Sequence, residues 1–266
     1  MKTLVLDLDE TLIHSLSRHN SSILTKNKGV TLEIKVNNNS LPTLYRIYKR
    51  PYVDEFLNIV KHWFNLVCFT ASIKEYADPV LDYLEAEVLS KDKTANSRTP
   101  RKKLFSQRFY RNACLFVDGK GYVKDLGVLV GQPVSRDVTG GSVSPDLAPL
   151  SSSGTLVNSP SSSSSSSSNT GSTGTPPSSD RCERSRSRSR SKTRNVTNDL
   201  SKVIIVDNSP VSYSFHKENG IMVEGWINDP DDMELMNLLP LLNSLRFTSD
   251  VRNVLSLKIG QSAFRE

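Results

Sequence analysis

Residues 2–11 read Lys2-Thr3-Leu4-Val5-Leu6-Asp7-Leu8-Asp9-Glu10-Thr11, a short apolar run followed at once by two carboxylates. Side chains two positions apart in a strand point to the same side, so Asp7 and Asp9 can approach one site if the strand bends open after Asp7. Carboxylates beside a buried strand must be hydrated, paired or bound to a metal. We therefore expect a strand over residues 2–7 that ends at an acidic site.

Two further apolar runs end in a polar residue: residues 66–69 precede Thr70, and residues 203–206 precede Asp207. Continuous apolar strands that alternate with helical patterns predict an α/β fold, with a mostly parallel central sheet and helices on both faces. Ligands of such sheets bind beyond the C-terminal ends of the strands. Asp7, Thr70 and Asp207 are therefore expected at one site.

The remaining segments give weaker signals. Alternating apolar residues over 30–36 and 44–48 predict a β-hairpin with one exposed face. Residues 114–117 and 122–123 are expected as short strands. The polar, basic stretch 88–108 is either a solvated loop or a rim that attracts an anionic substrate.

Three helix starts are predicted from capping patterns. Pro51 can occupy the first position of a helix whose apolar residues follow at three- and four-residue spacing. Residues 72–75 read Ser-Ile-Lys-Glu, a capping box for the next helix. Asp229 is expected to cap a helix that begins at Pro230.

The middle of the chain has a different composition, with an unbroken serine run over 161–168 and a Gly/Thr/Pro tract after it. Such residues cannot bury enough apolar surface to offset the entropy of ordering. We therefore expect residues 1–266 to form a single domain, interrupted by a disordered insertion at about 130–200.

The positive charge is concentrated in that insertion. The net charge is +6, and residues 181–194 contribute seven Lys or Arg and one Glu, so that 7 − 1 = +6 and the rest sums to zero. No nucleic-acid binding is therefore expected of the folded part. The Arg/Ser run itself could be a kinase target, an RNA-contacting segment, a nuclear-import signal or a solvated loop.

Cys68, Cys114 and Cys182 are odd in number and widely spaced, which favours a reducing compartment over a disulfide framework or a zinc site. No apolar stretch approaches the roughly 18–20 residues that span a bilayer, so the chain alone is expected to be soluble. A buried strand that begins at residue 2 is expected of a fragment or a trimmed chain.

Three polar groups accompany the opening carboxylates, and each has an ordinary alternative when taken alone. Thr70 places a hydroxyl at a strand end before a helix, where a phosphate could bind, but a simple cap is the alternative. Lys124 could equally be a surface lysine. Asp207 and Asn208 supply hard oxygen ligands suited to Mg²⁺, or belong to a turn before Pro210.

Taken together, Asp7–Thr11, Thr70, Lys124 and Asp207–Asn208 resemble, in order, the four motifs of the haloacid-dehalogenase (HAD) phosphohydrolases. The sequences of these motifs are similar to those of one branch of the family. This branch contains the RNA polymerase II C-terminal-domain (FCP/SCP-type) phosphatases and the Dullard-type phosphatases, which include the fungal nuclear-envelope morphology phosphatases. Segments that carry this closer similarity are 9–15, 49–52, 69–79, 207–213, 223–226 and 248–253. The resemblance covers about residues 2–130 and 200–266. It implies a HAD-like Rossmannoid fold with a small β-hairpin insert and no large cap domain.

The resemblance also implies the chemistry. Asp7 is the expected nucleophile, which forms an aspartyl-phosphate, and Asp9 is the expected general acid/base. Thr70 and Lys124 are expected to bind the phosphate oxygens.

A metal is implied as well. Mg²⁺ is expected on Asp7, the backbone carbonyl of Asp9 and Asn208, with Asp207 orienting the water around it. Arg111 stands where the family has an arginine that contacts the substrate.

The function that follows from the resemblance is a protein serine/threonine phosphatase for a lipin-like phosphoprotein, on the cytosolic face of the nuclear envelope and endoplasmic reticulum. A small membrane regulatory subunit is the expected partner. Two features depart from the family: its N-terminal membrane anchor is not in this sequence, and its members lack so long a Ser/Arg-rich segment. The alternatives are a phosphatase of the RNA polymerase II C-terminal domain and a non-catalytic, RNA-associated binding module.

Overall fold

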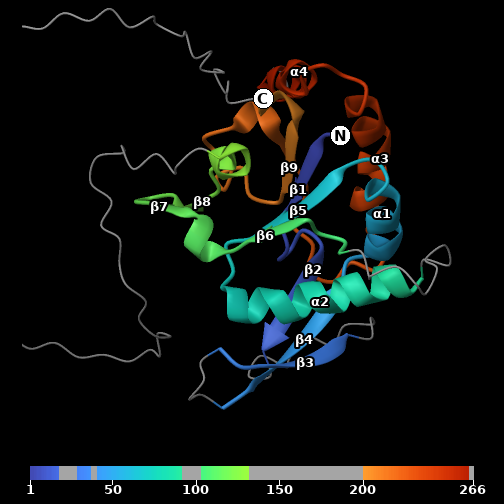
Figure 1. Ribbon diagram of the computed structural model, residues 1–266, viewed down its shortest axis with the longest axis vertical. Helices are drawn as coiled ribbons and strands as arrows, with labels where there is room; N and C mark the ends of the chain where they lie inside the picture. Colours follow the sequence, from blue (N-terminus) through green and yellow to red (C-terminus); the bar gives the residue numbers. More distant parts are fainter. Residues whose placement is uncertain (18–28, 37–40, 92–102, 132–199, 264–266) are drawn as a thin grey trace, which may run out of the picture. The chain divides into compact units, whose positions relative to one another are not determined.

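The computed structural model describes residues 1–17, 29–36, 41–91, 103–131 and 200–263, all of them in one compact unit (Figure 1). The predicted insertion, with its serine run and the Arg/Ser run, falls on residues 132–199 and lies outside the described residues. So does the hairpin turn at 37–40. Within the described ranges, no helix is long and apolar enough to cross a membrane.

A five-stranded sheet forms the centre of the unit. Its strands run in the order β10 (Gly220–Met222), β9 (Val203–Asp207), β1 (Thr3–Leu6), β5 (Asn65–Phe69) and β6 (Gln107–Phe109). Every neighbouring pair is parallel. The predicted α/β class is therefore confirmed. Because all five strands run the same way, their C-terminal ends lie at one edge, and Asp7, Thr70 and Asp207 lie there together.

The two faces of the sheet are covered differently. Leu4 and Leu6 point into a large core with α1 (Val53–Val60), α2 (Lys74–Ser90), α3 (Glu234–Leu245) and the start of α4 (Arg252–Ala263). Val5 and its neighbours on the adjacent strands point to the opposite face. Among the described residues, that second face is covered by the short 3₁₀ helices η3 (Leu126–Val130) and η4 (Leu200–Lys202) and by Tyr213. A further 3₁₀ helix, η5 (Lys217–Asn219), precedes β10.

The insert after β1 is a small antiparallel sheet. The predicted hairpin is present as β3 (Val30–Ile34) and β4 (Thr43–Lys49), and a third strand, β2 (Ile13–Ser17), pairs with β4. No larger cap is found in the part of the chain that the structure describes. Further along, η2 (Arg111–Ala113) leads into the antiparallel pair β7 (Leu115–Val117) and β8 (Gly121–Val123), as expected.

All three predicted helix starts are wrong, because each helix begins later than predicted. Helix α1 begins at Val53, after Tyr52, which has a positive φ of 60°. Helix α2 is preceded by Ile73 and has no side-chain cap, because the Ser72 hydroxyl donates to Asp9 instead. Helix α3 begins at Glu234. Only for α2 does a tertiary contact take the predicted capping side chain. Asp229 instead accepts the Asp231 backbone N–H at 3.0 Å, in the turn before α3.

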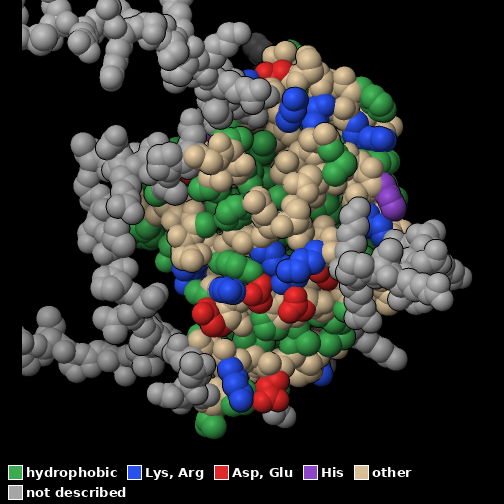
Figure 2. All heavy atoms as spheres, viewed as in Figure 1, with side chains coloured by type: hydrophobic (Ala, Val, Ile, Leu, Met, Phe, Trp, Pro, Cys, Tyr) green, Lys and Arg blue, Asp and Glu red, His purple; other side chains and the backbone are tan. Residues whose placement is uncertain are grey.

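The segment 88–108 is also more ordered than predicted, where it is described. Residues 107–109 form edge strand β6, and helix α2 continues to Ser90. Arg108 forms ion pairs with Asp78, Asp82 and Glu85. Figure 2 shows acidic and basic side chains gathered in one band over the region where Figure 1 draws α2 and β6. Residues 92–102 lie outside the description, so the predicted basic rim stays a prediction.

Candidate active site

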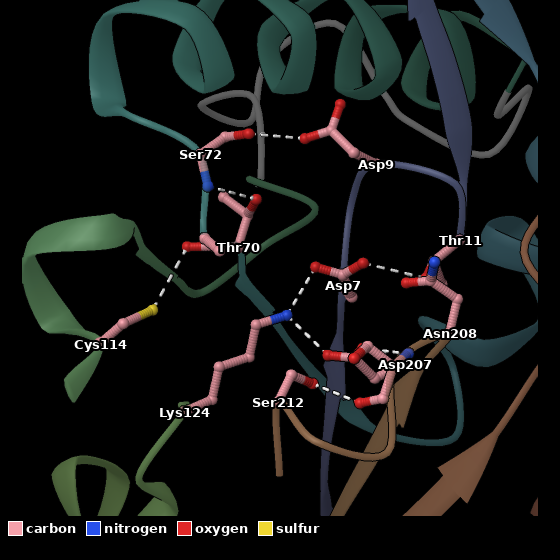
Figure 3. Close-up of polar contacts among 12 residues, drawn as sticks. Asp7, Asp9, Thr11, Thr70, Ser72, Cys114, Lys124, Asp207, Asn208 and Ser212 are labelled. Carbon is pink, nitrogen blue, oxygen red and sulfur yellow. Dashed lines mark hydrogen bonds and ion pairs between the residues drawn. The ribbon is translucent and has the colours of Figure 1, made fainter. Parts of the chain in front are cut away.

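Asp7 stands at the end of β1, where its backbone N–H donates to the Val206 carbonyl at 3.0 Å. Its side chain is buried between two donors. Oδ1 accepts from the Lys124 ammonium at 2.5 Å, and Oδ2 accepts from the Thr11 hydroxyl at 3.0 Å (Figure 3). Burial raises the pKa of Asp7 to about 7, against the opposing effect of Lys124 and with the help of Asp207 and Asp9. Asp7 is thus a desolvated carboxylate with a fixed orientation.

Lys124 follows β8 and reaches the same edge of the sheet. Its side chain is buried, and its ammonium lies between Asp7 Oδ1 and Asp207 Oδ2, the latter at 2.6 Å. Burial by itself lowers the pKa of this lysine, but the two carboxylates outweigh that effect and raise the pKa. An ammonium has three N–H donors. The third can therefore serve a ligand oxygen while the other two hold the carboxylates.

Asp9 points toward α2 rather than toward Lys124 (Figure 3). Its carboxylate accepts a hydrogen bond from Ser72 Oγ at 2.7 Å and one from the Tyr76 hydroxyl at 2.6 Å. Burial raises the pKa of Asp9, and the hydrogen bonds from Tyr76 and Ser72 oppose that rise. A carboxyl group with a raised pKa and two fixed partners is suited to hold and release a proton.

Thr70 follows β5 and is buried. Its Oγ1 accepts the Ser72 backbone N–H at 3.0 Å, which leaves the hydrogen of the hydroxyl to be donated elsewhere. Cys114 lies beside it, with Sγ 3.8 Å from the Thr70 carbonyl. Burial raises the pKa of the Cys114 thiol to about 11. The thiol is therefore protonated near neutral pH and unsuited to act as a nucleophile.

Asp207, the last residue of β9, and Asn208 after it complete the edge. Asp207 Oδ1 accepts the Ser209 backbone N–H at 2.8 Å, while its Oδ2 accepts from Lys124. Asn208 Oδ1 lies 3.4 Å from the Thr11 hydroxyl, so Thr11 stands between the side-chain oxygens of Asp7 and Asn208.

The donor set fits a hard divalent cation. Among the described residues, no three His, Cys, Asp or Glu side chains are arranged to hold a metal. A magnesium ion, however, also accepts amide and backbone carbonyl oxygens. Asp7 and Asn208 supply a carboxylate and an amide oxygen around Thr11. In addition, Asp7 and Asp207 share the single ammonium of Lys124, and Asp9 acts electrostatically on Asp7 as well, which leaves negative charge for a cation to offset.

Arg111 lies at the rim. Arg111 is the first residue of η2, and its Nε donates to the Ala71 carbonyl at 2.7 Å. Ala71 is the residue between Thr70 and Ser72. Its guanidinium stacks on the Tyr122 ring, 5.0 Å from the centroid. The side chain is exposed, so Arg111 lies outside the buried cluster.

The structure thus brings together Asp7, Thr70, Lys124 and Asp207, with Asp9 and Asn208 beside them and Arg111 outside. Sequence reasoning did not assign roles to Thr11, Ser72 and Tyr76. Thr11 belongs to the opening motif, and its position four residues after Asp7 could have indicated the contact. Ser72 fits the predicted capping box and Tyr76 follows it, and no sequence signal shows that Asp9 is their partner.

A parallel sheet with Asp7 after its first strand, and with Thr70, Lys124 and Asp207 at the same edge, is the arrangement expected from the resemblance to the HAD phosphohydrolases. The chain belongs to the NLI interacting factor-like phosphatase family, whose model matches residues 2–139 and 178–252. The predicted family is therefore confirmed.

Named relatives agree with this assignment. Nuclear envelope morphology protein 1 of Saccharomyces cerevisiae is 38% identical over 263 residues, which cover 99% of this chain and 43% of that protein. Its Schizosaccharomyces pombe counterpart is 35% identical, over 98% of this chain and 36% of that protein. CTD nuclear envelope phosphatase 1 of Xenopus laevis is 33% identical, over 98% and 73%. The chain thus spans less than half the length of the two yeast relatives.

A solved structure of the fission yeast RNA polymerase II CTD phosphatase Fcp1 is also similar. Its TM-score is 0.45 at 12% sequence identity, and the match covers 97% of this chain and 54% of that one.

Proposed function

We propose that this chain is the catalytic part of a Mg²⁺-dependent protein serine/threonine phosphatase that works through an aspartyl-phosphate. The observation that carries the proposal is the buried cluster in which Lys124 joins Asp7 to Asp207 at the C-terminal edge of the sheet, beside the Thr70 hydroxyl. Membership of a phosphatase family supports it.

The reaction has two steps. In the first, a carboxylate oxygen of Asp7 attacks phosphorus, the bond to the Ser or Thr oxygen breaks, and Asp9 donates a proton to that leaving oxygen. In the second, water attacks the phosphorus of the aspartyl-phosphate while Asp9 takes up one of its protons, which releases phosphate and restores Asp7. The third N–H of Lys124 and the Thr70 hydroxyl would stabilise the charge on the transferring oxygens.

Mg²⁺ would be held by Asp7, Asn208 and the backbone carbonyl of Asp9, and would offset the charge between an anionic nucleophile and an anionic phosphate. Asp207 would orient the surrounding water. Thr11, through its hydrogen bond to Asp7 Oδ2, keeps the carboxylate oriented between these groups.

We further propose a lipin-like phosphoprotein as substrate, at the cytosolic face of the nuclear envelope and endoplasmic reticulum, with a small membrane regulatory subunit as partner. The names of the relatives, which refer to the nuclear envelope, support this location. The absence of a large cap from the described residues favours a protein substrate over a small metabolite.

The test is phosphate release from lipin phosphopeptides, from heptad-repeat phosphopeptides of the polymerase and from p-nitrophenyl phosphate, with Mg²⁺ and with chelator. We expect all activity to require Mg²⁺ and the highest turnover on lipin peptides. Preference for the heptad peptides would transfer the proposal to the polymerase substrate. Asp7→Asn must abolish turnover on every substrate; retained activity would exclude the mechanism.

The metal assignment has its own test. Asn208→Ala is expected to raise the Mg²⁺ concentration for half-maximal activity by about tenfold or more, because an oxygen ligand is lost. Asn243→Ala, an exposed amide on α3, is the matched control. An unchanged requirement for Mg²⁺ would remove Asn208 from the site.

A further inference from the structure

The turn that carries Asp9 and Thr11 is held in place through three of its own backbone carbonyls, which accept hydrogen bonds from other parts of the chain. The Glu10 carbonyl accepts from the Trp226 backbone N–H at 2.8 Å, and the Leu12 carbonyl accepts from the Arg50 backbone N–H at 3.0 Å. Between them, the Thr11 carbonyl accepts from the Arg50 guanidinium at 3.2 Å. One side chain and two backbone segments from distant parts of the chain therefore meet on this turn.

The turn needs such support because it is strained. Glu10 has a positive φ of 58°, a conformation that non-glycine residues rarely adopt. Conformations of this kind cost of the order of 1–3 kcal/mol and persist only where the surroundings impose them. Glu10 lies between Asp9 and Thr11, so any relaxation of its backbone would move both neighbours.

Arg50 is fixed in turn by Asp232. Its side chain is fully buried and binds Asp232 through two parallel hydrogen bonds, from Nε at 2.8 Å and from Nη2 at 2.7 Å. Asp232 also accepts the Glu234 backbone N–H at the start of α3, at 3.2 Å. A bidentate pair of this geometry leaves the guanidinium little rotational freedom.

We propose that Arg50 and Asp232 are positioning residues for the phosphatase site. Held by Asp232, Arg50 fixes the Thr11 carbonyl, and with it the direction of the Thr11 hydroxyl toward Asp7 Oδ2. Neither residue is placed to contact the substrate. The inference rests on the function proposed above, because it concerns the alignment of the same nucleophile.

The test compares Asp232→Asn with wild type on p-nitrophenyl phosphate and Mg²⁺, at a temperature where circular dichroism shows both proteins fully folded. We expect kcat to fall by about 10- to 100-fold, because a misplaced reacting group costs about that much, while KM changes by less than about twofold. Arg50→Lys keeps the charge but not the paired hydrogen bonds, so its kcat should fall by a similar factor.

Glu85→Gln is the matched control, because Glu85 pairs with the partly buried Arg108 at 2.9 Å between α2 and β6, away from the turn. It should destabilise the fold yet leave kcat within about twofold of wild type. If Asp232→Asn kept wild-type kcat, or if Glu85→Gln lost as much activity, the pair would be merely structural.

A double-mutant cycle with Thr11→Val tests the route. If Arg50 acts through Thr11, the double variant Thr11→Val/Asp232→Asn loses clearly less than the product of the two single losses. Independent, multiplying losses would overturn the proposed route. An inactive wild type, or an active Asp7→Asn variant, would instead reject the phosphatase function and is seen before any Asp232 variant is compared.

Discussion

The Lys124 ammonium lies 2.5 Å from Asp7 Oδ1, and both side chains are buried. Lys124→Met removes the cation and leaves Asp7 and Asp207 together without it. Breaking one partner of a buried pair costs about 3–5 kcal/mol, so we expect a loss of that order in the free energy of unfolding at neutral pH. Denaturant titration measures it.

The exposed Lys120, on the turn between β7 and β8, provides the control variant Lys120→Met. Adding Asp207→Asn to Lys124→Met should recover part of the lost stability, since one buried charge is then removed. A Lys124→Met protein as stable as wild type would contradict this account of the cluster.

The pKa of Asp7 gives a pH-dependent stability. Because burial raises this pKa from 3.8 to about 7, the native state keeps a proton that the unfolded chain has already released between those values. This stabilising contribution is full below pH 3.8 and is lost as the pH rises through 7. Relative to Asp7→Asn, which cannot titrate, the wild type should therefore lose stability by a few kcal/mol from about pH 4 to 8, at about 1.4 kcal/mol for each pKa unit.

The measurement is urea unfolding of both proteins with chelator present, so that no metal alters the titration. Asp118→Asn, at an exposed carboxylate, serves as the control substitution. A stability difference between wild type and Asp7→Asn that is the same at pH 4 and pH 8 would show that Asp7 is not desolvated in the folded protein.

The hydrogen bond from Tyr76 to Asp9 favours the ionised carboxylate, so its removal should raise the pKa of Asp9 further. The second step of the proposed reaction needs ionised Asp9. In Tyr76→Phe we therefore expect the phosphoenzyme to break down more slowly than in wild type at the acidic end of the pH–rate profile and to recover at higher pH. With p-nitrophenyl phosphate as substrate, a rapid burst of p-nitrophenol release before slow turnover would indicate this slower breakdown.

Tyr83→Phe, a second tyrosine of helix α2, is the matched control. Its pH–rate profile should coincide with that of wild type. Should Tyr76→Phe also keep the wild-type profile, the hydroxyl does not tune the acid/base group.

Arg111 should contribute to the turnover of phosphopeptides but not to that of small aryl phosphates. It is anchored on the Ala71 carbonyl outside the buried cluster, so it can meet the polypeptide around the phosphorylated residue but not the transferring phosphate. Arg111→Ala is expected to reduce kcat/KM for a phosphopeptide by about tenfold, the value of one charged hydrogen bond. Turnover of p-nitrophenyl phosphate should stay unchanged, and equal losses on both substrates would place Arg111 inside the catalytic cluster instead.

We also propose that the chain is a single domain with an insertion. Val128, Leu129 and Val130 before the insertion pack against the same apolar cluster as Leu200 after it. Replacing residues 135–198 with a short Gly/Ser linker should therefore preserve one cooperative unfolding transition and aryl phosphatase activity within about twofold, because closure entropy varies slowly with length. Loss of either would show that the insertion takes part in the fold or the site.

The strand-end residues could be predicted from the sequence for a simple reason. Three apolar runs that each end in Asp or Thr imply parallel strands, and parallel strands bring Asp7, Thr70 and Asp207 to one edge without further information. The role of Lys124 could be predicted only from the family resemblance, because the residues around it are typical of any surface turn.

The supporting residues could not be predicted in the same way. Ser72 fits a capping box and Asp232 fits the first turn of a helix, so local rules account for both. Their actual partners, Asp9 and Arg50, lie 63 and 182 residues away. Only the packing of the sheet against α2 and α3 brings these pairs together, and a local sequence pattern does not indicate that packing.

The burial of Lys124 also affects how this protein meets covalent reagents. An amine must be unprotonated and reachable to be acylated, and this one is held as an ammonium between two carboxylates inside the protein. Acetylating enzymes and amine-labelling reagents will therefore modify exposed lysines such as Lys120 long before they reach it. In a labelling experiment, modification of Lys124 would mark molecules in which this buried cluster has opened.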